Sequence, residues 1–274
     1  MKENMKAEEL KQIVKSKYGQ IANQNKATNE SSCCGSGGCC STESYTVFSD
    51  SYDQVEGYHA DADLGLGCGI PTDYADIKVG QHVLDLGSGA GNDCFVARSI
   101  VGETGNVTGI DFTDEMLSKA VANANKLGYT NVEFIKGDIE EMPIDNNIID
   151  VIVSNCVLNL VPDKQKAFSE ILRVLKPGGH FCVSDVVVKG NLPENILHDA
   201  EMYAGCVSGA VEWDEYLSII ENLGFSGITI HKSKQINIPD EILKSYLDDQ
   251  EILEYKSKGA GLFSLTVTAY KPQH

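Results

Sequence analysis

The sequence predicts a doubly wound α/β fold, in which helices cover both faces of a mainly parallel sheet. Short runs rich in Val and Ile alternate with helix-like segments in a regular order, as a buried parallel sheet requires. A glycine-rich turn follows the first of these runs, at the position where sheets of this class bind their ligands. The 274 residues are enough for one large domain with a smaller appendage.

The N-terminal part, residues 1–44, is expected to hold one helix and a linker. Apolar side chains recur at helical spacing over 7–21, with Lys and Glu on the opposite side. The stretch 23–44 is rich in Asn, Ser, Thr and Gly and has little apolar surface to bury, so we expect a mobile linker. It carries two cysteine pairs, at 33–34 and 39–40.

The central part, residues 45–188, is expected to form the body of the α/β domain. Its strands are short apolar runs bounded by Gly and Asp, and its helices show apolar side chains three to four positions apart. The segment Leu175–Gly179, with its Pro and Gly residues, predicts a helix end followed by a turn. The expected strands span 82–86, 106–111, 132–135, 150–154 and 180–184, and the expected helices span 91–101, 113–127 and 164–175.

The C-terminal part, residues 189–274, is expected to add later strands to the same sheet and to form a cap region. A helical stretch over 194–223 precedes a strand at 226–231, and an alternating run at 262–270 predicts the final strand.

The charge balance excludes several partners. Lys and Arg total 22 against 40 Asp and Glu, a formal net charge of −18, so the surface repels nucleic acids and anionic membranes. The longest apolar stretch, 148–161, is too short and too polar to span a membrane, and the N-terminus lacks the apolar segment of a signal peptide. We therefore expect a cytoplasmic protein. In such a reducing compartment the nine cysteines are more often ligands, nucleophiles or redox partners than disulfides.

The segment Val83–Asp93 predicts a nucleoside site. Its glycines permit a tight turn and a close approach by a ligand, and Asp111 follows at the end of the next strand, where a carboxylate can accept both ribose hydroxyls. A glycine-rich turn alone would be weak support. The third glycine comes one residue earlier than in the dinucleotide fingerprint, Asp85 adds negative charge, and no Lys or Arg cluster is present to bind phosphate. A cationic nucleoside such as S-adenosylmethionine fits better.

The run Asp85–Gly91 resembles the glycine motif of the class I S-adenosylmethionine-dependent methyltransferases. The resemblance implies a Rossmann-like doubly wound sheet with this nucleoside as cofactor. The resemblance assigns Gly87, Ser88 and Gly89 to the methionine part, Asp111 to ribose, Phe112 to adenine, and Asp138 with Ile139 to the adenine edge, and Asp85 belongs to the same cofactor-binding motif. Asp138 could instead begin a turn, and Phe112 could be a core residue.

Three cysteines outside the linker stand in distinctive surroundings. The stretches around Cys68, Cys156 and Cys206 (LGLGCGIP, SNCVLNLVPDK and GCVSGA) resemble the cysteine motifs of the arsenite S-adenosylmethionine methyltransferases. Soft thiolates suit trivalent arsenic, and three of them leave it one lone pair for a methyl group. The resemblance thus implies arsenic(III) as substrate, methylation and arsenic detoxification. Cys94 and Cys182, inside a helix and a strand, are expected to be buried structural thiols.

The resemblance also implies a redox role for an upstream cysteine, for which Cys33 and Cys34 are the candidates. Methyl transfer formally leaves pentavalent arsenic, and a thiol pair can return two electrons by forming a disulfide, which thioredoxin or glutathione then reduces. The linker cysteines could instead form a zinc clip, although their spacing differs from common zinc motifs.

Two other functions remain open from the residues alone. The chain could methylate a small organic acceptor such as a quinone precursor, with incidental thiols, since free cysteines are often simply buried. It could also be a thiol-rich metalloid-binding or redox module that keeps the nucleoside fold without catalysis.

Overall fold

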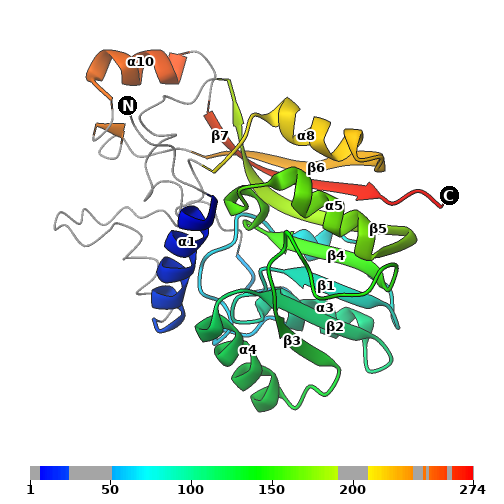
Figure 1. Cartoon of the computed structure of the whole chain (residues 1–274). Helices are drawn as coiled ribbons and strands as arrows, with labels where there is room; N and C mark the ends of the chain where they lie inside the picture. Colours follow the sequence, from blue (N-terminus) through cyan, green and yellow to red (C-terminus); the bar gives the residue numbers. More distant parts are fainter. Residues whose placement is uncertain are drawn as a thin grey trace.

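The computed structural model describes residues 7–24, 51–190, 209–236, 243–244, 247–257 and 261–273. Within these residues the chain forms a seven-stranded sheet in the order β3-β2-β1-β4-β5-β7-β6 (Figure 1). The first five strands in that order are parallel, and β7 is antiparallel to both of its neighbours. The expected doubly wound α/β fold is confirmed. The strands are β1 (His82–Leu86), β2 (Asn106–Asp111), β3 (Val132–Lys136), β4 (Ile149–Asn155), β5 (Leu175–Lys189), β6 (Ser226–Ile236) and β7 (Gly261–Tyr270).

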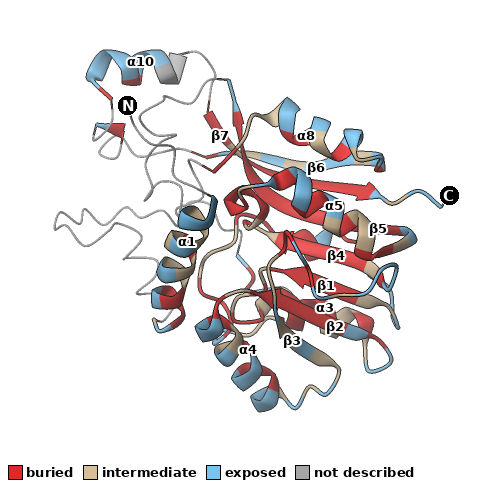
Figure 2. Ribbon diagram, in the orientation of Figure 1, coloured by how far each residue is buried: buried red, intermediate tan, exposed pale blue. Residues whose placement is uncertain are grey.

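Helices lie on both faces of this sheet. The described helices are α1 (Ala7–Ala22), α3 (Asn92–Val101), α4 (Asp114–Leu127), α5 (Lys164–Val174), α8 (Trp213–Asn222) and α10 (Asp249–Ser257), with short 3-10 turns η2 (Pro71–Asp73) and η3 (Leu158–Leu160). Figure 2 shows the central strands buried and the helices exposed on their outer sides. Helices α3 and α4 on one face, and α5 and α8 on the other, turn their apolar side chains toward the sheet.

Alternation along the strands divides the core between the two faces. In β1, Val83 packs with the residues of α3 and α4, whereas Leu84 and Leu86 pack on the opposite face with those of α5 and α8. Successive side chains of a strand point to opposite faces, so a strand that is covered on both sides is apolar on both. The expected runs of Val and Ile follow from this burial.

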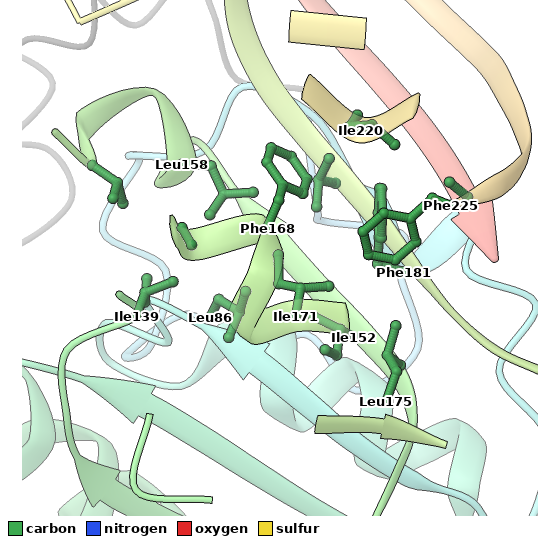
Figure 3. Packing of buried hydrophobic residues seen from close by; sticks show 14 of the residues in the cluster. Leu86, Ile139, Ile152, Leu158, Phe168, Ile171, Leu175, Phe181, Ile220 and Phe225 are labelled. Atoms are coloured by element: carbon green, nitrogen blue, oxygen red, sulfur yellow. The ribbon is translucent and has the colours of Figure 1, made fainter. Parts of the chain in front are cut away.

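Aromatic side chains fill the face that carries α5 and α8. Phe168 of α5 lies against Phe181 of β5 and Tyr216 of α8, with ring centroids 5.6 and 5.5 Å apart. Phe225, which precedes β6, meets Phe181 edge-on at 5.0 Å. Figure 3 shows Phe168, Phe181 and Phe225 within this cluster. The cluster anchors β5, and β5 in turn carries the antiparallel end of the sheet.

The segment expected to be a turn, Leu175–Gly179, instead begins β5. The helix before it ends at Val174, as expected, but Leu175 already pairs with Ile149 of β4. The register then shifts, and His180 pairs with Val151, so the Pro and Gly residues form an irregular start to the strand. The helical stretch expected over 194–223 is described only in part, as α8, because residues 191–208 lie outside the described residues.

Candidate active site

A cavity lies at the carboxyl ends of β1 and β4, where open α/β sheets bind ligands. Its empty volume is about 810 Å³, a figure that includes open solvent at its mouth. The loop 62–67 and two side chains of α1, Val14 and Tyr18, complete its wall. Helix α1 lies beside this end of the sheet and next to α4 (Figure 1). An N-terminal helix therefore takes part in the site.

The glycine-rich turn forms the floor of the cavity. Gly87 has φ +69°, in the left-handed region that favours glycine, and a Cβ there would lie 2.5 Å from a γ-carbon of Val157. The N–H groups of Gly87 and Ser88 donate to the Ile110 carbonyl at 2.8 and 3.0 Å, which ties the turn to β2. Within the described residues, Ser88 Oγ and Asn92 Oδ1 are buried without a hydrogen-bond partner, and both residues line the cavity. Buried polar atoms of this kind can take a hydrogen bond from a bound ligand or from water.

Asp111 braces this turn in the structure. Its two carboxylate oxygens accept the N–H of Gly89 at 3.0 Å and that of Thr113 at 2.8 Å. Burial raises the pKa of Asp111, and these backbone hydrogen bonds oppose the rise. Asp111 is not among the described residues that line the cavity, and its contact with ribose stays a prediction.

The other expected cofactor residues divide into two groups. Asp85, Ser88, Gly89 and Phe112 line the cavity together with Gly87. Asp138 and Ile139 are not among the described residues that line it, and their contact with an adenine edge stays a prediction. Asp138 pairs instead with Lys11 of α1 at 2.6 Å, and Ile139 packs in the core beside α5.

Two buried carboxylates make the cavity acidic. Asp85 accepts a hydrogen bond from the Cys94 thiol at 3.2 Å, and burial followed by the nearby charge of Asp93 raises the pKa of Asp85 well above its usual value. Burial also raises the pKa of Asp93 to about 6, against the opposing hydrogen bonds from Tyr52 and Asn155. Such a wall suits a cationic ligand and repels phosphate. Cys94 is buried as expected, yet it has this polar contact and is more than a small apolar side chain.

Sequence reasoning missed three residues of this wall: Tyr52, Asp93 and Asn155. The Tyr52 hydroxyl donates to Asp93 at 2.7 Å and accepts from the Asn155 amide at 2.8 Å. Asp93 lies two residues after the glycine motif and Asn155 directly precedes Cys156, so their positions beside these motifs were a usable signal. Tyr52 had no such neighbour.

Cys68 and Cys156 come together in the structure although they are far apart in the sequence. Both are buried in one apolar cluster with Leu160 and Val186, with exposed fractions of 1% and 5%. Burial, followed by the charge of Asp185, raises the pKa of the nearby Tyr216 phenol, whose hydroxyl donates to Asp185 at 3.0 Å. Cys156 lines the cavity, whereas Cys68 is not among the described residues that line it.

Cys156 also has a strained backbone. Its φ is +60°, a left-handed value that non-glycine residues rarely adopt, and its N–H donates to the Ser184 carbonyl at 2.7 Å. Because this residue directly follows β4, the strain turns the chain at the mouth of the cavity.

The remaining predicted thiols lie outside the described residues: Cys206, Cys33 and Cys34. Within the part of the chain that is described, no three His, Cys, Asp or Glu side chains form a metal-binding group. None of the described helices is long and apolar enough to cross a membrane. Cys182 is fully buried in β5, as expected, and burial raises the pKa of its thiol.

The chain is similar to known methyltransferases. A family model described as a methyltransferase domain matches residues 77–224. An arsenite methyltransferase from Halobacterium salinarum is 38% identical over 97% of this chain and 67% of its own length. The crystal structure of an arsenic(III) S-adenosylmethionine methyltransferase from Chlamydomonas reinhardtii aligns with 75% of this chain and 68% of its own, with a TM-score of 0.64 and 35% identity.

A ubiquinone/menaquinone biosynthesis C-methyltransferase from Psychromonas ingrahamii is 40% identical over 112 residues, which are 40% of this chain and 45% of that protein. A protein of the same name from Enterobacter sp. is 30% identical over 70% of this chain and 75% of its own length, so the arsenite methyltransferase from Halobacterium salinarum matches more of the chain, at higher identity than this one. The chain spans about two thirds of the length of the Halobacterium salinarum protein and of the Chlamydomonas reinhardtii protein.

Proposed function

The chain belongs to the arsenite methyltransferase family, and from this premise we propose that it methylates trivalent arsenic held by the thiolates of Cys68, Cys156 and Cys206. Membership makes it an S-adenosylmethionine-dependent methyltransferase. The arsenic substrate, its thiolate ligands and the reduction steps are our proposal.

The residues of the cavity fit S-adenosylmethionine. Ser88 Oγ and Asn92 Oδ1 offer unused hydrogen-bonding capacity, and the lack of a side chain at Gly87 leaves room along the turn. A ligand that carries both an ammonium and a sulfonium would favour the ionised form of Asp85 and Asp93, whose pKa values burial raises. When bound, this cofactor supplies an electrophilic methyl group.

Each expected cofactor residue has a distinct proposed contact. We assign Gly87, Ser88 and Gly89 to the methionine part, and Asp111 to ribose. Phe112, which lines the cavity, would pack on adenine. Asp138 and Ile139 would meet the adenine edge, which for Asp138 means sharing its carboxylate with Lys11.

The thiols would bind and orient the substrate. Thiolates are soft ligands that match trivalent arsenic, and three of them can displace its hydroxide ligands. The apolar cluster around Cys68 and Cys156 excludes water from the sulfurs, and the strained backbone of Cys156 aims that residue toward the cavity. Proximity and orientation in a dry pocket would supply most of the rate enhancement.

Reduction would complete the cycle. Methylation formally leaves pentavalent arsenic, so two electrons must return, and a pair of thiols provides them as it becomes a disulfide. We assign this role to Cys68 with either Cys33 or Cys34, and we propose thioredoxin or glutathione as the reductant that restores the thiols.

The observation that carries the proposal is the burial of Cys68 and Cys156 in one cluster next to the cavity. Its test is the incubation of the purified protein with arsenite, a thiol and methyl-labelled S-adenosylmethionine, followed by speciation of the arsenic. Cys68→Ser, Cys156→Ser and Cys206→Ser should each lose methylation by about a hundredfold or more, beyond the roughly 10–100-fold typical for residues that only support a ligand. Calorimetry should still show cofactor binding.

Cys182→Ser is the matched control, because it makes the same change at a buried thiol of β5. It should keep methylation once circular dichroism confirms its fold. Near-normal methylation by both Cys68→Ser and Cys156→Ser would remove the proposed site. Turnover of a quinone precursor that ignores all three substitutions would favour the organic-acceptor alternative.

A further inference from the structure

Asn155 lies between the two buried cysteines and contacts the backbone of one of them. It is the last residue of β4 and immediately precedes Cys156. Its side-chain oxygen accepts the N–H of Cys68 at 3.0 Å and the N–H of Gly69 at 3.3 Å. One short side chain therefore ties the loop of Cys68 to the strand end that carries Cys156.

The other half of the Asn155 amide is oriented by buried partners. Its nitrogen donates to the Tyr52 hydroxyl and the Gly69 carbonyl, both at 2.8 Å, and to Asp93 at 3.2 Å. A reversed amide would turn its N–H groups toward the N–H donors of Cys68 and Gly69, and its oxygen toward the Asp93 carboxylate. The contacts thus permit a single orientation of this amide.

The loop also packs closely against its supports. A Cβ at Gly67 would lie 2.6 Å from the Asn155 amide nitrogen, and a Cβ at Gly69 would lie 2.6 Å from Ser184 Oγ. The Cys68 carbonyl accepts a hydrogen bond from Ser264 Oγ at 2.6 Å. Both backbone polar groups of Cys68 are therefore held, one by β4 and the other by β7.

We propose that Asn155 is a positioning residue that sets the placement of Cys68 relative to Cys156, and thereby the geometry in which the two thiolates take arsenic. This inference rests on the proposed function, because it assumes that both thiols are ligands. The notion that Asn155 only stabilises the fold predicts a loss of stability without a selective change in arsenic binding. Asn155 also lines the cavity, so a direct cofactor contact is the other alternative.

The experiment compares Asn155→Ala with the wild-type chain by steady-state methylation kinetics, equilibrium dialysis of arsenite and calorimetry of S-adenosylmethionine. We expect the KM and the Kd for arsenite to rise about tenfold or more, which corresponds to about 1.4 kcal/mol. The Kd for S-adenosylmethionine should change by less than about threefold. Tyr52→Phe removes the hydroxyl that accepts from the Asn155 amide and also bonds Asp93 and the Gly69 carbonyl. It should raise the arsenite KM by about threefold with less than a threefold change in the cofactor Kd, and it decides the question if Asn155→Ala does not fold.

Asn131→Ala is the matched control. The Asn131 amide also joins three groups: it accepts from Arg98 and donates to the carbonyls of Gly102 and Gly105, away from the cavity. This variant should lose stability and keep both Kd values.

Each outcome decides the proposal. A folded Asn155→Ala protein with a wild-type KM and Kd for arsenite overturns it, as does a change confined to the cofactor Kd. An unchanged arsenite KM in Tyr52→Phe overturns it where Asn155→Ala is unfolded. If the wild-type chain neither binds nor methylates arsenite, the proposed function fails and this inference falls with it, whereas arsenite turnover by the wild type together with an unaffected Asn155→Ala removes the positioning role alone.

Discussion

Replacing Gly87 by alanine should damage the turn between β1 and α3 in two separable ways. The residue has φ +69°, where a side chain is strained, and its new Cβ would lie 2.5 and 2.7 Å from the two γ-carbons of Val157. Val157 is β-branched and stiff at χ1, so it cannot easily rotate away. Alanine at position 87 therefore lowers the stability of the fold in two ways, through a strained backbone and through overpacking against Val157.

The magnitude follows from those two contributions. A left-handed backbone costs a non-glycine residue roughly 1–2 kcal/mol. Overpacking by one methyl group in a close-packed region costs roughly 1–3 kcal/mol. We expect Gly87→Ala to lower the free energy of unfolding by about 2–5 kcal/mol.

A second glycine separates the two contributions. Gly128, after α4, has φ +70°, and no atom of the described residues lies within 4 Å of the position of its Cβ. Gly128→Ala should therefore show the backbone cost alone, roughly 1–2 kcal/mol. Adding Val157→Ala to Gly87→Ala should recover the packing cost and leave the backbone cost, which a double-mutant cycle measures.

Urea unfolding followed by circular dichroism is the assay, and calorimetry of S-adenosylmethionine is the functional readout. Because Gly87 lines the cavity, its substitution should also weaken cofactor binding, which Gly128→Ala should not do. Equal losses of stability for the two glycine variants, with no coupling between Gly87 and Val157, would refute the reasoning.

Three further substitutions test other parts of the structure. Burial raises the pKa of Asp93 to about 6, above its unfolded value, so the contribution of Asp93 to the free energy of unfolding should fall as pH rises from about 4 to about 6. In urea titrations over this range, the free energy of unfolding of Asp93→Asn should depend less on pH than that of the wild type. The same pH dependence in both proteins would contradict the burial. Desolvation lowers the pKa of Lys11, but its hydrogen bonds to Asp138 and Glu140 outweigh this, so the net pKa is raised. Lys11→Met should speed hydrogen exchange in α1 and weaken cofactor binding by about threefold, in line with an ion pair worth up to about 1 kcal/mol. Unchanged hydrogen exchange in α1 would show that these ion pairs do not hold the helix in place. Phe168→Ala should lower the free energy of unfolding by about 3–5 kcal/mol in urea titrations, because the ring is fully buried. A loss below about 1 kcal/mol would mean that the aromatic side chains around Phe168 close the cavity that the substitution leaves.

The fold was predictable because its strands are buried on both faces. In such a strand both sets of alternating side chains are mainly apolar, so β1 and β4 appear in the sequence as short runs rich in Val, Ile and Leu, interrupted by Asp85 in β1 and Asp150 in β4. The start of β5 was not predictable in the same way. Pro and Gly after α5 are typical of a turn, and only the pairing of Leu175 with Ile149 makes that segment part of the strand.

The candidate site was predictable where its residues are neighbours in the sequence. The turn at Gly87 carries its own backbone requirement, and Cys156 stands in a distinctive local stretch. The network of Tyr52, Asp93 and Asn155 is different, because its members come from separate segments and meet only through hydrogen bonds across the fold.

By itself, then, the order of amino acids determined the local elements of this protein, the glycine turn and the chemical types available to the site, because these depend on side-chain periodicity and on backbone freedom at single residues. Tertiary structure alone decided which distant groups meet. Cys68 lies near Cys156 because β4 and β7 hold its loop between them, and Lys11 brings α1 to the cavity because Asp138 follows a neighbouring strand. Such contacts depend on chain packing in three dimensions, which no short stretch of sequence encodes.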